Sequence, residues 1–450
     1  MERSSSSTSS DQYEQVKSVD WISILPNDVL LRILSRLCTK EAVRTSVVFK
    51  RWEHVWKQLS HLVFDKPKTT NSTELGSNPD DKLITKVINN HEGHIESCVI
   101  NYSSSQGLSG ILDTWIQSLT SVKHTKVLTL IRHYDCWDRT GKVFEFPSNS
   151  FSHPSLMSLS LRSYTFRSSH PFRNCSNLRT LKLVSINATE VEVFNTLLSS
   201  CPSLEVLVLN ISCIHDTGGP LKIENNKLKL LHVLFMHTIG GLQVSSTSLD
   251  VLVIENVCFQ EEDFFLCAPR LLFSRKFFAP HISYNISKEE KSIVHEEFVN
   301  NIGLFKSIIL MTASMSVSIN LMNRTEVERL RQVLGLWIRR MRVLEITFKD
   351  NNNAPDESSE KKLWEEDNDN NVVAYPNAKF RVKTLWMPNF SGSEEEFAFA
   401  SCLIKHGTVV DGMMIKTSSF SARKKSEIEA AVNKLRALQT EEDQLMIKCF

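Results

Sequence analysis

Apolar residues recur at helical spacing between Trp21 and Phe64, where they predict three short helices. The first helix follows Leu25-Pro26, and Asn27 and Asp28 are expected to cap it. Its apolar positions lie three or four residues apart: Val29, Leu30, Ile33, Leu34 and Leu37. This spacing predicts one amphipathic helix.

Two further helices are predicted in the same segment. Thr39 is expected to cap the second, and Glu41 lies in its first turn, where the helix dipole favours an anion. The second helix carries Ala42, Val43, Ser46 and Val47, and the third carries Trp52, Val55, Trp56 and Leu59. A unit of about 45 residues lies near the lower limit for independent folding, and this one has more apolar side chains than its interior can hide. The surplus predicts a partner surface, as in a helix that docks in a groove.

A second pattern, Leu-x-x-Leu-x-Leu, repeats from about residue 95 onward. Its clearest first leucines are Leu156, Leu178, Leu204, Leu228 and Leu249, which are 22, 26, 24 and 21 residues apart. Leucine-rich repeats have periods of about 20–29 residues, and only stacking buries the apolar face of each repeat. We therefore expect a solenoid whose core is built between neighbouring repeats.

Weaker elements fit around the leucine repeats. Further strands are expected at Ile95–Ile100, Val127–Leu130, Lys306–Leu310 and Val343–Phe348. Helical periods at Val191–Leu198 and Glu326–Ile338 suit the convex side of the solenoid. Cys175 and Cys201 each precede the first leucine of a repeat by three residues, and a small buried group explains them better than a redox or metal role.

Composition separates three other segments. Residues 1–17 are Ser-rich and predict a flexible tail. Residues 350–374 are acidic and Asn-rich, which favours a solvated loop over a docking site. Residues 375–450 predict a compact strand-helix-strand-helix-strand module. Its strands are expected at Val382–Met387, Val409–Ile415 and Leu445–Phe450, and its helices at Glu394–His406 and Ser426–Leu438.

Charge and hydropathy exclude several classes of partner. The 52 Lys and Arg nearly balance the 51 Asp and Glu, so no bulk positive charge is available for nucleic acid. The most apolar runs, such as residues 228–236, are about half the length of a membrane span, so no membrane partner is predicted. The N-terminal serine run does not resemble a secretory signal, and we expect a soluble intracellular protein of the nucleus, the cytoplasm or both.

No cofactor, metal or catalytic residue is predicted. The ten cysteines contain no C-x-x-C pair, which suits reduced, buried thiols. His91 and His94 are three residues apart beside a glycine, whereas the zinc-protease string needs two histidines four apart on a helix. No G-x-S-x-G elbow or phosphate-binding glycine loop occurs. The pattern favours a binding protein over an enzyme.

The segment at residues 18–65 resembles a plant F-box. The shared features are Leu25-Pro26, the aliphatic helix Val29–Leu37, the turn Thr39–Val43, and Lys50-Arg51-Trp52 followed by Trp56. It departs from the family pattern at Cys38, where proline is usual, and at Phe49, where a small residue is common. The stretch from Ala378 to Phe450, with NFSGSEEEF, CLIKHG and EIEAAVNKLRAL, resembles the FBD domain that accompanies F-boxes and leucine-rich repeats in plants.

The resemblance implies an α+β fold: a three-helix F-box at 18–65, a leucine-rich-repeat horseshoe at 90–349, and an FBD module at 375–450 that continues it. It implies the non-catalytic substrate receptor of an SCF-type cullin-RING ubiquitin ligase. The F-box would bind a Skp-type adaptor, and through it a cullin and a RING subunit, while the repeats would hold a target protein. A non-degradative scaffold and a free repeat protein capped by the F-box-like segment are the alternatives.

The resemblance also assigns adaptor contact to matching positions of the F-box segment. Three of the apolar positions are as much expected to hold the helices together as to touch the adaptor: Leu34, Leu37 and one of the two tryptophans. The assigned residues are Leu25, Pro26, Val29, Leu30, Ile33, Leu34, Val43, Ser46, Val47, Trp52 and Trp56.

Overall fold

A computed structural model describes most of the chain between residues 22 and 450. The described residues are 22, 24–47, 50–65, 79–103, 109–133, 145–147, 151, 154–215, 219–257, 259–272, 280–289, 292–304, 314–337, 340–349, 375–417, 421–439 and 445–450. The predicted tail at 1–17, the acidic loop at 350–374 and the strand expected at Lys306–Leu310 lie outside them.

The N-terminal helical unit contains α1 (Asn27–Leu34), α2 (Thr39–Arg44) and α3 (Trp52–Trp56). The predicted caps are wrong. Pro26 and Cys38 occupy the N-cap positions of α1 and α2, and neither forms a side-chain cap. The polar residues expected there bond elsewhere: the Thr39 hydroxyl accepts a hydrogen bond from the backbone N–H of Val63 at 2.7 Å, and Asn27 accepts one from Arg51 at 2.7 Å.

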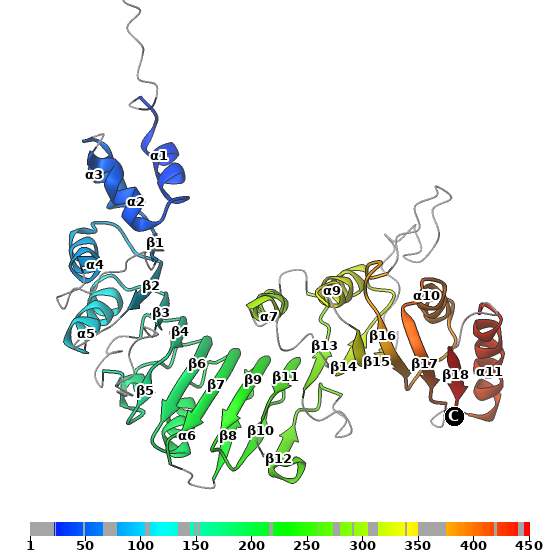
Figure 1. The fold of residues 1–450 in the computed structure, drawn as a ribbon. Helices are drawn as coiled ribbons and strands as arrows, with labels where there is room; N and C mark the ends of the chain where they lie inside the picture. Colours follow the sequence, from blue (N-terminus) through cyan, green and yellow to red (C-terminus); the bar gives the residue numbers. More distant parts are fainter. Residues whose placement is uncertain are drawn as a thin grey trace, which may run out of the picture.

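A long sheet follows and runs through the rest of the described chain (Figure 1). Its order is β1-β2-β3-β4-β6-β7-β9-β11-β13-β14-β15-β16-β17-β18, with β5 beside β6. The strands of its first half are β1 (His61–Phe64), β2 (Ser97–Ser103), β3 (Val127–His133), β4 (Ser158–Arg162), β5 (Thr165–Phe166), β6 (Thr180–Ala188), β7 (Val206–Cys213), β9 (Leu230–His237) and β11 (Val251–Glu255). All are parallel to their neighbours within this half.

The leucine repeats form two buried ladders across this half, as the spacing predicts. One ladder is Leu159, Leu181, Leu207, Leu231 and Leu252, and each residue is in register with the next. The second begins at Leu161 and ends at Ile254 in the same way. None of the ladder residues is exposed, since stacking of consecutive repeats buries each apolar face.

Helices and a second sheet cover the leucine side of the first half. The helices are α4 (Pro79–Asn90), α5 (Ser109–Gln117) and α6 (Val191–Ser199). The second sheet consists of the parallel strands β8 (Pro220–Glu224), β10 (Gly241–Ser245) and β12 (Phe264–Cys267). Phe194 of α6 and Leu242 of β10 share one hydrophobic core with the leucine ladders.

The direction of the sheet reverses after β11. Strand β13 (His281–Asn285) pairs antiparallel with β11, and every later strand is parallel to β13. Crossover connections between parallel strands are right-handed, so reversing the strands moves their helices to the opposite face of the sheet. Nothing in the leucine spacing predicts this reversal.

The second half therefore has its core on the other face. Its strands are β14 (Ser314–Ile319), β15 (Met341–Phe348), β16 (Val382–Met387), β17 (Val409–Ile415) and β18 (Met446–Cys449), and its helices are α7 (Ile293–Leu304), α9 (Arg324–Gly335), α10 (Glu394–Lys405) and α11 (Ala422–Arg436). The prediction that both solenoid helices lie on the convex side is wrong for the later one. Leu330 of α9 packs in the second core, together with Val208 of β7, whereas Leu207 of β7 lies in the first.

Residues 375–450 contain the five predicted elements in the predicted order: β16, α10, β17, α11 and β18. Serine caps start both helices. Ser393 accepts a hydrogen bond from the N–H of Glu396, and Ser421 accepts one from the N–H of Lys424. Glu396 adds to the first cap because its carboxylate accepts from the N–H of Ser391 at 2.6 Å.

Candidate functional site

The N-terminal helical unit is joined firmly to the first repeat. Strand β1 pairs with β2, so the chain passes directly from α3 into the long sheet. The carbonyl of Lys57 accepts hydrogen bonds from Glu92 and Gly93, and the carbonyl of Ser60 accepts from Glu96. Because one continuous hydrophobic core spans the junction, the helical unit has a fixed direction relative to the repeats.

Seven of the residues assigned to adaptor contact lie wholly or partly at the surface of this unit. The exposed fractions are 38% for Val29, 40% for Ile33 and 87% for Val47, and Pro26 is also exposed. The half-buried residues are Leu25, Val43 and Ser46. All of these side chains except Ser46 are apolar, and an exposed apolar surface suits contact with a partner.

Four of the assigned residues are buried in the structure, which leaves little of their surface for a direct contact with an adaptor. Leu30 and Leu34 have no exposed surface, and Trp52 and Trp56 are 7% and 5% exposed. All four belong to the core shared with the first repeats. Both tryptophans, and not one of them, hold the helices together in this structure.

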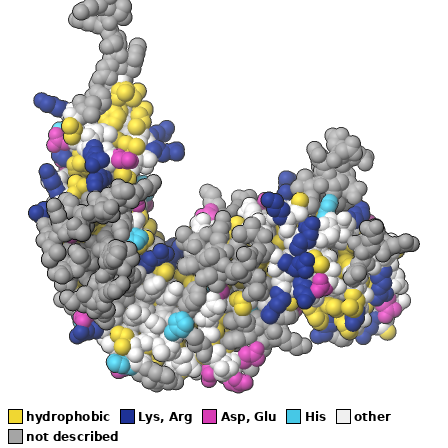
Figure 2. Space-filling model, in the orientation of Figure 1, with side chains coloured by type: hydrophobic (Ala, Val, Ile, Leu, Met, Phe, Trp, Pro, Cys, Tyr) yellow, Lys and Arg dark blue, Asp and Glu magenta, His cyan; other side chains and the backbone are white. Residues whose placement is uncertain are grey.

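Among the described residues of the unit, three exposed apolar side chains were not assigned to adaptor contact. Ile22 and Ile24 are 46% and 61% exposed, and Leu37, equally expected to hold the helices together or to touch the adaptor, is 37% exposed. The spacing of the apolar positions along α1 could have revealed the exposed position of Leu37. Val29 and Ile33 are four apart on one stripe of α1, Leu37 continues their spacing, and Leu30 and Leu34 form the neighbouring buried stripe. Figure 2 shows hydrophobic side chains between Lys and Arg on this limb of the molecule.

Comparison with known proteins supports this reading of the N-terminal unit. Residues 22–64 match the model of the F-box domain. The chain is 60% identical to F-box protein At1g80960 of Arabidopsis thaliana over 98% of its own length and 92% of that protein. The chain belongs to the F-box protein family. F-box domains generally bind Skp-type adaptors, and a role in ubiquitin ligases is typical of F-box proteins.

Further matches cover the repeats and nearly the whole chain. Residues 112–272 match the model described as FBD-associated F-box protein At5g56370, LRR repeats. Putative F-box protein At1g67390 and F-box protein At3g60790, both of Arabidopsis thaliana, are 42% and 40% identical over 96% of this chain and 92% and 90% of their own lengths. A chain of a solved octameric complex of Latrophilin 3, Unc5D and FLRT2 covers 79% of this chain and 84% of its own length, at 10% identity and a TM-score of only 0.24. The two family models together give a helical F-box followed by a leucine-rich-repeat region.

The face of the sheet opposite the leucine ladders is the second candidate surface of this F-box protein. Helix α7 covers part of this face, because Phe298 packs in the same core as Val206 and Val253. Lys182 of β6 forms an ion pair with Glu297 of α7, with 2.5 Å between Nζ and Oε2. Closer to the F-box, one cross-strand row on this face remains half-buried: Val63, Val99, Thr129 and Ser160, ending at Lys182.

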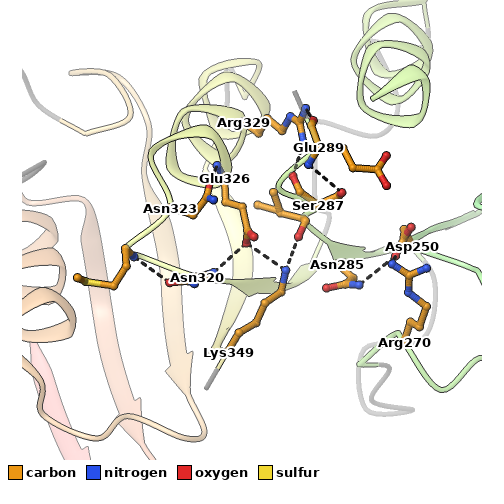
Figure 3. A network of polar contacts seen from close by, with 12 residues as sticks. Asp250, Arg270, Asn285, Ser287, Glu289, Asn320, Asn323, Glu326, Arg329 and Lys349 are labelled. Carbon is orange, nitrogen blue, oxygen red and sulfur yellow. Dashed lines mark hydrogen bonds and ion pairs between the residues drawn. The ribbon is translucent and has the colours of Figure 1, made fainter. Parts of the chain in front are cut away.

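A polar network stabilises the region where the sheet reverses (Figure 3). Asn285 of β13 donates to the carboxylate of Asp250 at 2.9 Å, and Arg270 pairs with the same carboxylate at 2.9 Å. Burial raises the pKa of Asp250, while Arg270 opposes the shift. Nearby, Lys349 pairs with the buried Glu326 at 3.0 Å. These groups satisfy one another, so the network has a structural role.

The histidines and cysteines considered in the sequence also have structural surroundings. A ring nitrogen of buried His91 lies 2.8 Å from the carbonyl of Leu59, and burial lowers its pKa. A hydrogen bond with Cys175, together with burial, raises the pKa of the Cys201 thiol, which makes it a poor nucleophile. Within the described residues, no group of three or more His, Cys, Asp or Glu is placed to hold a metal ion. None of the helices in that part of the chain combines the length and apolar content that a membrane span requires.

Proposed function

We propose that this F-box protein is the target-recognition subunit of an SCF-type cullin-RING ubiquitin ligase. The observation that carries the proposal is the exposed apolar surface of the F-box: Val29, Ile33 and Val47, extended by Ile22, Ile24 and Leu37. A Skp-type adaptor would cover this surface, and the adaptor would connect the chain to a cullin and a RING subunit. The chain itself would be non-catalytic and would act inside the cell, in the nucleus, the cytoplasm or both.

The fixed junction between F-box and repeats supports the same proposal. A ligase receptor must hold its target at a constant place relative to the rest of the complex. The backbone hydrogen bonds from Glu92, Gly93 and Glu96 to the end of the F-box provide that constancy. The half-buried row from Val63 to Ser160 is the proposed surface for the target protein.

The module at residues 375–450 is proposed to be an FBD domain. Its parallel strand-helix-strand-helix-strand order and the names of several relatives support this. In this proposal the module closes the end of the sheet. Side chains at and just after the end of α11 border the last strand: Arg436 donates to the carbonyl of Ile447 in β18, and Gln439, beyond the helix, donates to the carbonyl of Leu445, which precedes β18.

The proposal is tested by affinity capture of the full chain from plant cells in which the proteasome and cullin activity are blocked. The matched control is the full chain with I33E and V47E, which places charges on the exposed F-box surface and leaves Val63 and the junction in place. We expect a Skp-type adaptor, a cullin and a RING subunit with the full chain, and their loss from the control. The target should be retained by both and should live longer when the protein is removed. An adaptor complex whose targets keep their half-lives would instead favour the non-degradative scaffold.

A further inference from the structure

A cavity of about 310 Å³ lies at the edge of the C-terminal module where strands β15 to β18 begin. It is lined by Arg340, Arg381, Ile404, Gly407, Val409, Val410 and Leu445. Ligand pockets have volumes of roughly 300–1,000 Å³, so the space suits a small group or the end of a peptide. The F-box surface and the target surface proposed above do not include these residues.

The walls of this cavity divide into a cationic part and an aliphatic part. Arg340 and Arg381 immediately precede β15 and β16, so neighbouring parallel strands bring their side chains to one edge. Ile404 and Val409 are buried and form the aliphatic part together with the half-buried Val410 and Leu445. Gly407 follows the C-cap of α10 with a φ of +58°, and open space lies where a side chain would project.

The described lining residues include no carboxylate, although two guanidinium groups are present. Arg381 donates to the carbonyls of Ala378 and Phe380, which orients its side chain. Asp411, next to Val410 on β17, pairs with Lys383 at 3.6 Å. Within the described part of the chain, neither arginine forms an ion pair with an acidic residue. Figure 2 shows Lys and Arg side chains in a column across this half of the molecule.

We propose that this cavity binds a carboxylate attached to a short aliphatic group. Guanidinium groups bind carboxylates through charge-assisted, often bidentate hydrogen bonds, and the aliphatic wall would cover a side chain such as that of leucine. The chemistry fits the free C-terminus of a protein that ends in an aliphatic residue, and it fits a small aliphatic acid. The assignment to a target protein rests on the proposed function; the binding site does not.

The test is fluorescence anisotropy with the full chain and a labelled peptide, Gly-Ser-Gly-Ser-Leu, with a free C-terminal carboxylate or with an amide. The free acid should bind at least tenfold more tightly, because the amide cannot accept the same charged hydrogen bonds. Arg340→Gln and Arg381→Gln should each weaken binding about 10- to 100-fold. Arg423→Gln, which removes a 93% exposed arginine on α11, is the matched control and should change nothing.

Competition with 4-methylpentanoate distinguishes the two sources of the ligand. If 4-methylpentanoate displaces the labelled peptide at concentrations similar to those of the unlabelled peptide acid, a small aliphatic acid is a sufficient ligand. If it displaces the peptide much more weakly, the ligand is a protein C-terminus. Both results support the site. Equal binding of acid and amide, or unchanged binding by both arginine variants, would overturn it.

Glu441, Glu442 and Asp443 precede Leu445 in the sequence and lie outside the described residues. Binding seen only after E441Q, E442Q and D443N are combined would also overturn it, because the chain's own carboxylates would then fill the site. No adaptor is present, so failure here leaves the proposed function untouched.

Discussion

Lys182 on β6 and Glu297 on α7 form an ion pair across the face of the sheet, although 115 positions separate them in the chain. The contact exists because the strands reverse after β11, which brings the helices of the second half over a face that the first half leaves open. The repeat surface available to a partner is therefore smaller than the leucine spacing suggests. It is confined to the strands between the F-box and α7.

This ion pair should stabilise the contact between the two halves. Lys182 and Glu297 are 20% and 24% exposed, so solvent screens their interaction only in part. In a double-mutant cycle with K182A and E297A, we expect a coupling free energy of about 1 kcal/mol from denaturant unfolding. Lys126 and Glu96, both 48% exposed at 3.6 Å, provide the control pair. A coupling no larger than that of the control would contradict the role given to α7.

Leu34 and Ile33 are adjacent in α1 but should respond differently to truncation. Leu34 is fully buried, so L34A removes core contacts and leaves a cavity, and we expect a loss of about 2–5 kcal/mol in the free energy of unfolding. Ile33 is 40% exposed, so I33A should cost less than about 1 kcal/mol. Equal losses in chemical denaturation would mean that the stripe of α1 facing the core is assigned wrongly.

His281 should make the fold sensitive to mild acid. Burial, with a smaller contribution from Arg342, lowers the pKa of His281 to about 3. The folded chain therefore keeps the ring neutral, whereas the unfolded chain binds a proton below the ordinary pKa of 6.5. The stability of the fold is unaffected by this group above pH 6.5 and decreases as the pH falls from 6.5 toward 3. The loss from this group amounts to about 5 kcal/mol at most.

The matched variant is H281Q, which keeps a polar group near Ser283 and Ser314, the hydrogen-bond partners of the ring. The pKa values of Asp250, Glu345 and Glu396 are raised, so these groups stabilise the folded state as the pH falls. The contribution of His281 is therefore the difference in pH dependence between the natural chain and H281Q. Melting temperatures from pH 7 to pH 5 should fall more steeply for the natural chain. Parallel curves would rule out the buried neutral histidine.

The last strand should be necessary for the C-terminal module. Ile447 is buried, the N–H of Phe450 donates to Ile415 at 3.0 Å, and the N–H of Thr417 donates to Phe450 at 2.7 Å. Removal of residues 445–450 exposes this core and leaves the edge of β17 unpaired, so the melting temperature should drop by several degrees. M446A, which changes an exposed side chain of the same strand, is the control. An unchanged melting temperature after truncation would show that β18 contributes no stability.

The elements set by short-range patterns were predictable from the sequence. The leucine ladders from Leu159 to Leu252 follow from periodicity, and β16 and β17 coincide with their predicted ranges. The reversal at β13 was not predictable, because it depends on how β11 and β13 pair and not on the period of either strand. Thr39 was misread as a cap because its true partner, the N–H of Val63, is 24 residues away.

The sequence predicted which segment forms the candidate site, but not which of its apolar residues are exposed. The F-box pattern locates the right segment, yet it does not separate Ile33 at the surface from Leu34 in the core. That separation depends on the first repeat, whose core continues through the junction and buries Trp52 and Trp56. A sequence pattern records that a position is apolar; the neighbouring strands decide which apolar positions remain for a partner.

The most direct test of the central claim is the affinity of the purified full chain for a purified Skp-type adaptor, measured by calorimetry. I33E and V47E together place two charges on the proposed docking surface, and V122E places one on Val122, which is 69% exposed on the repeats. Burying an unpaired charge is costly, so the double variant should bind at least about 100-fold more weakly while its melting temperature stays within a few degrees of that of the natural chain. V122E should bind as tightly as the natural chain. Undiminished binding by the folded double variant would contradict the claim that these exposed F-box residues contact the adaptor.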